Sequence, residues 1–418
     1  MGGKSKKLLK LGRFVPGSSS STPTPNTVSK FDAETTQLAN THIANDDVIQ
    51  LRQLATTRGL VSKSLRKRAW PYLLNARPTG IYGTGPDAIA YREHANTTHK
   101  DNAVVRADID RSLWKFSEGW TDEERAIERE RLKNMINACV EGNDQGVYYY
   151  QGLHDVASVL LLVCGEGAAH GMLHRLVRCH LRDCTRSTMD PALRTLRLLY
   201  PILKHADTEL YTFLTRLALV EPALEMPYFA LSWYMTWFAH DVDSLDDISR
   251  LFDLFVASHP LMPIYVAAEV LVGARKEILK LGPEPELVFS FLNKLSITGP
   301  GRPTIDDLTK RAVALFKSVS PHDLTSGRFG KLKRELLASS AAPFAYLSDG
   351  RWQIPPIPEP TDARPPITSH SLYSNERKHT GTSSSTARVD PTTPNVTLAV
   401  GTAAVLLAGV FAAFSSTH

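Results

Sequence analysis

The sequence has 418 residues, of which 43% are hydrophobic and 22% are charged, as in a globular protein that can bury a sizeable core. Five basic residues within the first thirteen positions account for the formal net charge of +5, so the rest of the chain has no net charge. The absence of net charge over most of the chain argues against a nucleic-acid-binding domain, which needs a basic surface to bind phosphates. Four cysteines are too few for a disulfide scaffold in so long a chain and indicate a reducing compartment.

Residues 1–45 are expected to be disordered. Their basic residues are Lys4, Lys6, Lys7, Lys10 and Arg13. We interpret this run either as a contact for an anionic membrane surface or as a solvated tail, since such charge runs rarely fold. Residues 14–30 are rich in Ser, Thr and Pro and cannot bury enough apolar surface to order themselves.

Residues 46–338 are expected to form one all-α region, because apolar residues recur there at helical spacing and strand-like alternation is scarce. Two amphipathic stripes consist of Leu210, Phe213, Leu214 and Leu217, and of Ile248, Leu251, Phe252 and Phe255. The run 156–163 is apolar nearly all round, which is typical of a helix in the centre of a bundle. Prolines such as Pro191, Pro222 and Pro263 mark helix ends or starts, because proline inside a helix costs about 3 kcal/mol.

Residues 339–394 are rich in Pro, then in Ser and Thr, and are expected to be a flexible linker. After them come nineteen residues without a charge, 396–414. At about 1.5 Å per residue this stretch covers about 28 Å, close to the hydrocarbon thickness of a bilayer. Within residues 395–418 we therefore expect a single-pass tail anchor that leaves the rest of the protein in the cytosol. The alternative is a core helix rich in Ala and Gly that would lie beyond the linker.

The sequence has no GxxxxGKS/T loop after a strand, no GxSxG elbow, no HExxH motif and no CxxC pair. His170 and His174 are four residues apart, with Cys179, His180 and Cys184 close behind, and this spacing could build a metal site. No acidic or cysteine pair completes the set, so core packing and exposure to solvent explain these histidines better. We therefore expect no metal site.

Two short segments carry candidate functional residues. In the segment VRADIDR, Asp108 and Arg111 are three residues apart and would share one face of a helix, so that the carboxylate can hold the guanidinium in place. In the segment YYQGLHD, Gln151 and Gly152 directly precede the apolar run, which places Gln151 near a helix start, where its side chain can project from a fixed backbone. Taken alone, the first segment could be a surface ion pair and the second an ordinary turn.

Together these segments resemble the TBC family of Rab GTPase-activating proteins. The family's IxxDxxR and YxQG motifs match Val105, Asp108 and Arg111, and Tyr149, Gln151 and Gly152, with valine for isoleucine as the one departure. Its RxxxW motif matches Arg66 and Trp70, and its Arg-Leu-aromatic-Asp run matches residues 250–253. The four matches occur in the family's order and cover about residues 55–340.

Other segments are similar to the tail-anchored, endoplasmic-reticulum member of that family, which acts on Rabs of the early secretory pathway. They are residues 149–155, 180–183 and 259–265. The short apolar stretch at 396–414 also suits the thinner bilayer of the endoplasmic reticulum. The resemblance therefore implies a protein of the endoplasmic-reticulum membrane whose catalytic domain lies in the cytosol.

The resemblance also implies a two-lobed, all-α TBC domain that binds the GTP form of a Rab small GTPase and accelerates its GTP hydrolysis. Arg111 would be an arginine finger oriented by Asp108, and Gln151 would replace the GTPase's own glutamine. The supporting residues would be Tyr149, Gly152, Asp155, Arg66 and Trp70. GTP and Mg²⁺ would be carried by the partner, so the chain would need no cofactor of its own and would not hydrolyse nucleotide by itself.

Two alternatives remain open at this point. The first is a non-catalytic, membrane-anchored scaffold that binds a Rab without accelerating it. The presence of both Arg111 and Gln151 argues against it, because a protein that has lost the activity tends to lose one of them. The second is a metal-dependent hydrolase built on His170 and His174.

Overall fold

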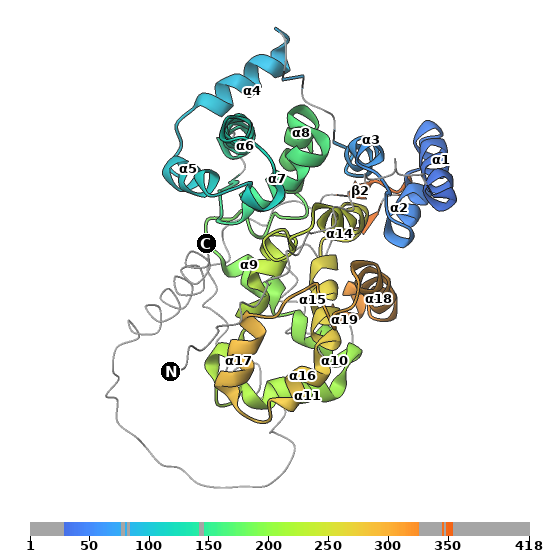
Figure 1. Cartoon of the computed structure of the whole chain (residues 1–418), viewed down its shortest axis with the longest axis vertical. Helices are drawn as coiled ribbons and strands as arrows, with labels where there is room; N and C mark the ends of the chain where they lie inside the picture. Colours follow the sequence, from blue (N-terminus) through green and yellow to red (C-terminus); the bar gives the residue numbers. More distant parts are fainter. Residues whose placement is uncertain are drawn as a thin grey trace, which may run out of the picture. The chain divides into compact units, whose positions relative to one another are not determined.

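The computed structural model describes residues 29–76, 80–81, 84–141, 146–325, 345–346 and 348–353, and nearly all of the regular secondary structure in them is helical (Figure 1). The first helices are α1 Lys30–Ala44, α2 Val48–Thr57, α3 Lys63–Leu73, α4 Pro86–Asn96, α5 Asn102–Asp110, η1 Trp114–Phe116 and α6 Asp122–Glu141. The next are α7 Leu153–Cys164, α8 Glu166–Leu176, α9 Asp190–Leu196, α10 Leu199–Ala206, α11 Thr208–Leu217, α12 Pro222–Glu225, η3 Tyr228–Ala230 and α13 Leu231–Met235. The last elements are α14 Leu245–Ala257, α15 Met262–Gly273, α16 Arg275–Lys280, α17 Pro285–Asn293, α18 Ile305–Ser318, α19 Pro321–Thr325, β1 Ala345–Tyr346 and β2 Trp352–Gln353.

The helices form two groups (Figure 1). In the first group α6 contacts α4, α5, α7 and α8, and in the second α15 contacts α10, α13, α16 and α18. Between the groups, α3, α7 and α14 contact one another. The described part of the chain therefore has the two lobes that the sequence led us to expect.

Helix α7 lies where the apolar run predicted a central helix. Nine of its residues are buried, including Val156, Leu160 and Val163, and it contacts α3, α6, α8 and α14. An amphipathic helix would bury only one stripe, whereas this helix buries most of its surface because neighbours cover several of its sides. The helix thereby gives the segment that directly precedes it, which contains Gln151, a rigid support.

The amphipathic stripes and most of the proline positions are also confirmed. Leu210, Leu214 and Leu217 are buried along α11, and the stripe of α14 is buried throughout. Pro191 and Pro263 stand in the first turns of α9 and α15, where the missing amide hydrogen costs nothing.

A buried carboxylate joins α3 to α14. Asp253 on α14 is fully buried, and it accepts hydrogen bonds from the amide of Leu60 at 2.8 Å, from Nε of Arg66 at 3.1 Å and from Nε1 of Trp70 at 2.7 Å. Burying a carboxylate without such partners would cost on the order of several kcal/mol of folding free energy. Arg66 and Trp70 therefore serve the packing of α3 on α14.

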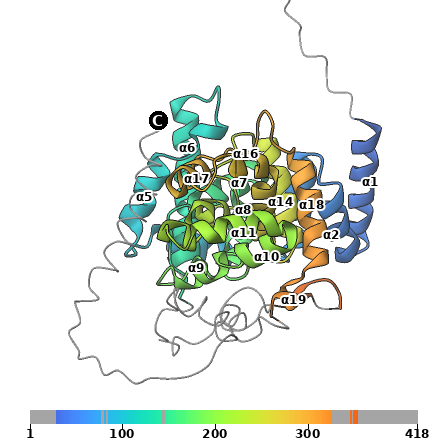
Figure 2. The ribbon, with the colours of Figure 1, turned by 90° about the horizontal axis from the view of Figure 1, so that it is seen from below.

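The expected disorder of residues 1–45 is wrong for the last part of that range, because residues 30–44 form α1. Ser29 caps the helix by accepting a hydrogen bond from the amide of Asp32 at 3.0 Å. The helix buries only Thr35 and Ala39, so the sequence shows little apolar periodicity. It lies at one edge of the molecule beside α2 (Figure 2).

The expected linker 339–394 is likewise wrong at Ala345–Tyr346 and Trp352–Gln353, where β1 and β2 form a two-stranded antiparallel sheet. Trp352 is buried, with the guanidinium carbon of Arg52 at 5.2 Å from its ring centroid. Nε of Arg52 donates to the carbonyl of Gly350 at 2.9 Å. These contacts tie the short sheet to α2, and they also make the all-α description incomplete by two short strands.

In the described part of the chain no helix combines the length and the apolar character that crossing a bilayer requires. The segment 396–414 lies outside the described residues, as do the basic run of residues 1–13 and most of the expected linker.

Candidate functional site

Arg111 stands at the C-terminal end of α5, where an ion pair anchors its guanidinium group. Its Nη2 donates to Oδ1 of Asp108 at 2.6 Å, and the Asp108 side chain is only 2% exposed. The Arg111 side chain itself is 53% exposed. The buried carboxylate of Asp108 thus anchors the guanidinium, while about half of the Arg111 side chain stays exposed to solvent. The three-residue spacing of Asp108 and Arg111 predicted this pairing.

The backbone after Arg111 is fixed by α6. Nε and Nη2 of Arg129 both donate to the carbonyl of Ser112, at 3.2 and 2.9 Å. The hydroxyl of Ser112 donates back to the carbonyl of Ile109 at 2.8 Å. Leu113 then takes a positive φ of 70°, which is uncommon for a leucine. These bonds hold a tight turn between α5 and η1.

The segment before α7 positions Gln151. Gly152 has φ of 106°, and a Cβ atom at this residue would lie 2.9 Å from Cγ2 of Thr236, so a larger side chain would be strained and crowded. The hydroxyl of Tyr150 donates to the carbonyl of Met235 at 2.8 Å. Gln151 is half-buried between these two fixed residues and is followed by Gly152, the N-cap of α7.

One hydroxyl connects the arginine turn with the glutamine segment. The hydroxyl of Tyr149 donates to Oδ2 of Asp108 at 2.7 Å and lies 3.1 Å from Nδ1 of His154. Burial, and next the negative charge of Asp108, raise the pKa of Tyr149 well above its ordinary value, so the phenol stays protonated and remains a donor. Asp108 therefore binds Arg111 through one oxygen and Tyr149 through the other.

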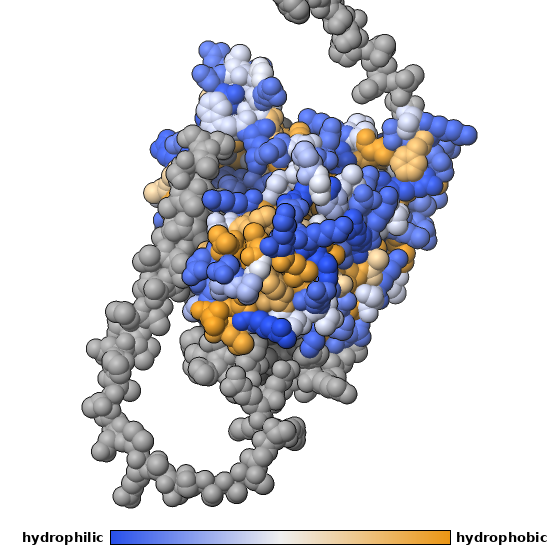
Figure 3. Space-filling view, turned by 60° about the horizontal axis from the view of Figure 1, so that its bottom comes forward, coloured by the Kyte–Doolittle hydropathy of each residue, from blue (hydrophilic) through white to orange (hydrophobic). Residues whose placement is uncertain are grey.

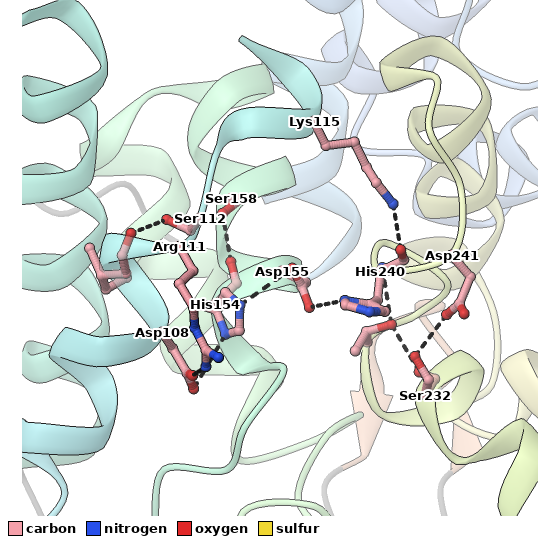
Figure 4. Close-up of polar contacts among 12 residues, drawn as sticks. Asp108, Arg111, Ser112, Lys115, His154, Asp155, Ser158, Ser232, His240 and Asp241 are labelled. Carbon is pink, nitrogen blue, oxygen red and sulfur yellow. Dashed lines mark hydrogen bonds and ion pairs between the residues drawn. The ribbon is translucent and has the colours of Figure 1, made fainter. Parts of the chain in front are cut away.

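The network continues along α7 to the segment before α14 (Figure 4). Asp155 lies 3.5 Å from Nε2 of His154 and 3.3 Å from Nδ1 of His240. Burial alone would raise the pKa of Asp155, but the charges of His154 and His240 outweigh burial and lower it. Burial lowers the pKa of His240, but its hydrogen bond to Asp155 and the charge of Asp155 raise it overall. The two groups therefore form an ion pair at pH values between the lowered pKa of Asp155 and the raised pKa of His240.

Lys115, on the turn that follows Arg111, also contacts the segment that contains His240. Its ammonium donates to the carbonyl of His240 (Figure 4). It also lies 3.1 Å from Oδ1 of Asp243. The turn that follows Arg111 is therefore attached both to α6, through Arg129, and to the segment 240–243.

The structure gathers Asp108, Arg111, Tyr149 and Asp155 into one network, whereas the polar atoms of Arg66 and Trp70 bond to Asp253. The sequence analysis missed Arg129, Lys115 and His240. Lys115 and His240 are 125 residues apart in sequence, so no local pattern could pair them. For Arg129, the only signal is its place on the first turns of a charged helix.

No group of His, Cys, Asp or Glu within the described residues could hold a metal ion. At the alternative site, His170 packs edge-on against Tyr91, with ring centroids 4.8 Å apart. Burial lowers the pKa of both His170 and His174 to about 4. His170 is therefore a packed side chain of α8, and among the described residues no ligand set is assembled around it.

Comparison with known proteins gives a consistent result. The family model of the Rab-GTPase-TBC domain matches residues 63–279. TBC1 domain family member 20 of Homo sapiens is 33% identical over 295 residues, which are 70% of this chain and 69% of that protein. The GTPase-activating protein gyp10 of Schizosaccharomyces pombe is 29% identical over 73% of this chain and 78% of its own length.

Solved structures show the same fold. The RabGAP TBC domain of a Chlamydomonas flagellar protein has a TM-score of 0.51 at 19% identity, covering 68% of this chain and 92% of that one. The Ypt/Rab-GAP domain of Gyp1p has a TM-score of 0.52 at 14% identity, covering 68% and 99%. The resemblance drawn from the sequence motifs is therefore confirmed, and the chain belongs to the family of Rab-GTPase-TBC domain proteins.

Proposed function

We propose that this chain is a GTPase-activating protein for a Rab small GTPase in its GTP form, and that Arg111 and Gln151 act in trans on the bound nucleotide. The observation that carries the proposal is the carboxylate of Asp108, which binds Arg111 on one side and Tyr149 on the other. Membership of the family, and relatives named as GTPase-activating proteins, support it.

The chemistry needs little from the chain beyond charge and orientation. In GTP hydrolysis, negative charge spreads over the oxygens of the transferring phosphoryl group, and an arginine supplied in trans accelerates the reaction by about 10³–10⁵. Arg111 is suited to this role because its guanidinium is anchored and half-exposed. Asp108 orients the guanidinium without neutralising the whole fork, since a planar guanidinium has five donors.

Gln151 would orient the attacking water. A side-chain amide has both a donor and an acceptor, so it can bind the water and a neighbouring oxygen at once. The fixed backbone of Tyr150 and Gly152 supports such an orientation, because precise catalysis needs side chains on rigid supports. GTP and Mg²⁺ would enter with the partner GTPase, and the chain needs no cofactor of its own.

The proposal is tested by GTP hydrolysis across a panel of Rabs with this chain in excess. Arg111→Ala should lower the stimulated rate by about 10³-fold or more on the responding Rab, and Arg111→Lys should be nearly as poor, because an ammonium lacks the planar fork. The matched control is Arg58→Ala, which removes another partly exposed arginine, paired with Glu34 at the end of α2. An Arg111→Ala protein with near-normal activity and unchanged helical circular dichroism would refute the assignment. Binding without acceleration by the unmodified chain would favour the scaffold alternative.

We further propose that residues 396–414 attach the protein to the endoplasmic-reticulum membrane, and that its substrate is a Rab of the early secretory pathway. Nineteen uncharged residues are long enough to span, and the segments 180–183 and 259–265 support the pathway. Truncation after residue 394 should release the protein from carbonate-washed membranes and leave its activity on soluble Rab unchanged. A truncated protein that stayed in the carbonate-resistant pellet would contradict the anchor.

A further inference from the structure

A large aromatic side chain lies exposed close to Arg111. Trp114, three residues after Arg111 in the sequence, is 56% exposed. Single exposed apolar residues are common on protein surfaces and need no special explanation. This one differs because its ring and both its flanks are held in place by specific contacts.

Two arginines of α6 hold the ring. The guanidinium carbon of Arg125 lies 3.9 Å from the ring centroid of Trp114, and that of Arg129 lies 5.0 Å away. Arg125 is itself fixed, since Nε donates to the hydroxyl of Ser117 at 3.0 Å and Nη1 to Asp122 at 2.8 Å. A tryptophan stacked on a bonded guanidinium has little rotational freedom left to lose when a partner binds.

The backbone on each side of Trp114 is held as well. Before it, Arg129 binds the carbonyl of Ser112, and after it, Lys115 binds the carbonyl of His240 and pairs with Asp243. The fold therefore presents Arg111 and Trp114 on one short, fixed turn.

The distance between Arg111 and Trp114 can be compared with the size of a typical protein interface. Three peptide units reach at most about 11 Å between Cα atoms. A specific interface buries about 800 Å² on each partner, which corresponds to a disc of about 16 Å radius. An interface of that size centred on Arg111 therefore extends past the Cα atom of Trp114.

We propose that Trp114 is a docking residue that inserts into an apolar hollow on the partner GTPase, next to its nucleotide. This inference rests on the proposed function. Tryptophan is enriched among residues that dominate binding energy, and these cluster near the centre of an interface. In small GTPases the surface beside the nucleotide is ordered by the γ-phosphate and released after hydrolysis. Trp114 therefore favours the GTP form of the partner over its GDP form.

The test compares Trp114→Ala and Trp114→Phe with the unmodified chain, using the Rab that responds best in the panel. For Trp114→Ala, the KM for the Rab in its GTP form should rise by about 10- to 100-fold, with kcat changed by less than about threefold, because the lost contact serves binding rather than chemistry. Trp114→Phe should lie between the two. Calorimetry with the Rab bound to a non-hydrolysable GTP analogue should show the same loss of affinity.

The matched control is Leu219→Ala. Leu219 is 65% exposed and follows α11 in the sequence. Helix α11 lies at the bottom of Figure 1, and Figure 3 turns that side forward, where apolar side chains lie among hydrophilic ones. KM and kcat should not change. Circular dichroism and thermal unfolding check that each variant is folded. If Trp114→Ala proves unstable, Trp114→Phe decides the matter, since its ring still packs on Arg125.

An unchanged KM in a folded Trp114→Ala protein would overturn the inference, and so would an equal loss of affinity for the GDP and GTP forms. Neither result would contradict the proposed function, which is tested separately by Arg111→Ala. Conversely, an active Arg111→Ala protein would refute the proposed mechanism whatever the result at Trp114.

Discussion

The hydroxyl of Tyr149 connects the two parts of the proposed catalytic site, so its removal should affect activity and stability together. In Tyr149→Phe, Oδ2 of Asp108 loses a hydrogen bond of 2.7 Å, and His154 loses a neighbour at 3.1 Å. Asp108 is buried, and a hydrogen bond to a charged group is worth about 1.5–3 kcal/mol. We expect the free energy of unfolding to fall by about that amount.

The same change should lower kcat by about tenfold with little effect on KM, because Asp108 still binds Arg111 but loses its hydrogen bond to the segment that carries Gln151. Urea unfolding followed by circular dichroism gives the stability. Single-turnover and steady-state GTP hydrolysis on the responding Rab give kcat and KM.

Tyr150→Phe is the matched control, since the neighbouring hydroxyl donates at a similar distance, 2.8 Å, to the carbonyl of Met235. It removes a bond to a neutral acceptor, worth about 0.5–1.5 kcal/mol, and leaves Asp108 untouched. Stability should fall modestly, and kcat should fall less than in Tyr149→Phe, because Gln151 loses one backbone support while Asp108 keeps both of its partners. Equal values of kcat for Tyr149→Phe and Tyr150→Phe would refute the idea that Tyr149 couples the two segments.

Three further predictions concern neighbouring parts of the domain. Asp253→Ala should lower the free energy of unfolding by about 3–5 kcal/mol, as measured by urea titration, because it leaves buried donors unpaired. The ion pair of Asp155 and His240 should stabilise the fold most at mildly acidic pH, between the ordinary pKa values of 3.8 for the carboxyl and 6.5 for the imidazole. The contribution of His240 is lost as pH rises through its raised pKa, and that of Asp155 as pH falls through its lowered pKa. His240→Asn should therefore flatten the alkaline side of a plot of urea midpoint against pH, and an unchanged slope would contradict the pairing. Gly152→Ala should lower both kcat and the thermal unfolding temperature, since its φ is 106° and the added carbon would meet Thr236.

Local sequence pattern predicted the helices that bury a strong apolar face. The run that became α7 and the stripes of α11 and α14 needed no tertiary information, because burial of these faces dominates their energetics. The pairing of Asp108 with Arg111 was equally predictable, since both residues lie within one helical turn. The position of Gln151 shortly before α7 was also predictable, because the start of the apolar run marks the start of the helix.

The remaining features depend on contacts between distant residues. Helix α1 buries only two residues, and the strands β1 and β2 have two residues each, so neither gives a readable period. Trp352 is buried because Arg52, some 300 residues earlier in the sequence, packs on its ring. His240 gains its role from its contacts with Asp155 and Lys115, both distant from it in sequence. Such partners become visible only when the chain is folded.

The central claim is that this chain supplies a glutamine as well as an arginine. The most direct measurement is GTP hydrolysis by a Rab whose own catalytic glutamine has been replaced, with the unmodified chain and with Gln151→Ala. We expect the unmodified chain to stimulate this Rab at least in part, and Gln151→Ala to stimulate neither it nor the normal Rab. A mutant Rab that does not respond, together with a Gln151→Ala chain that stays active on the normal Rab, would contradict the account.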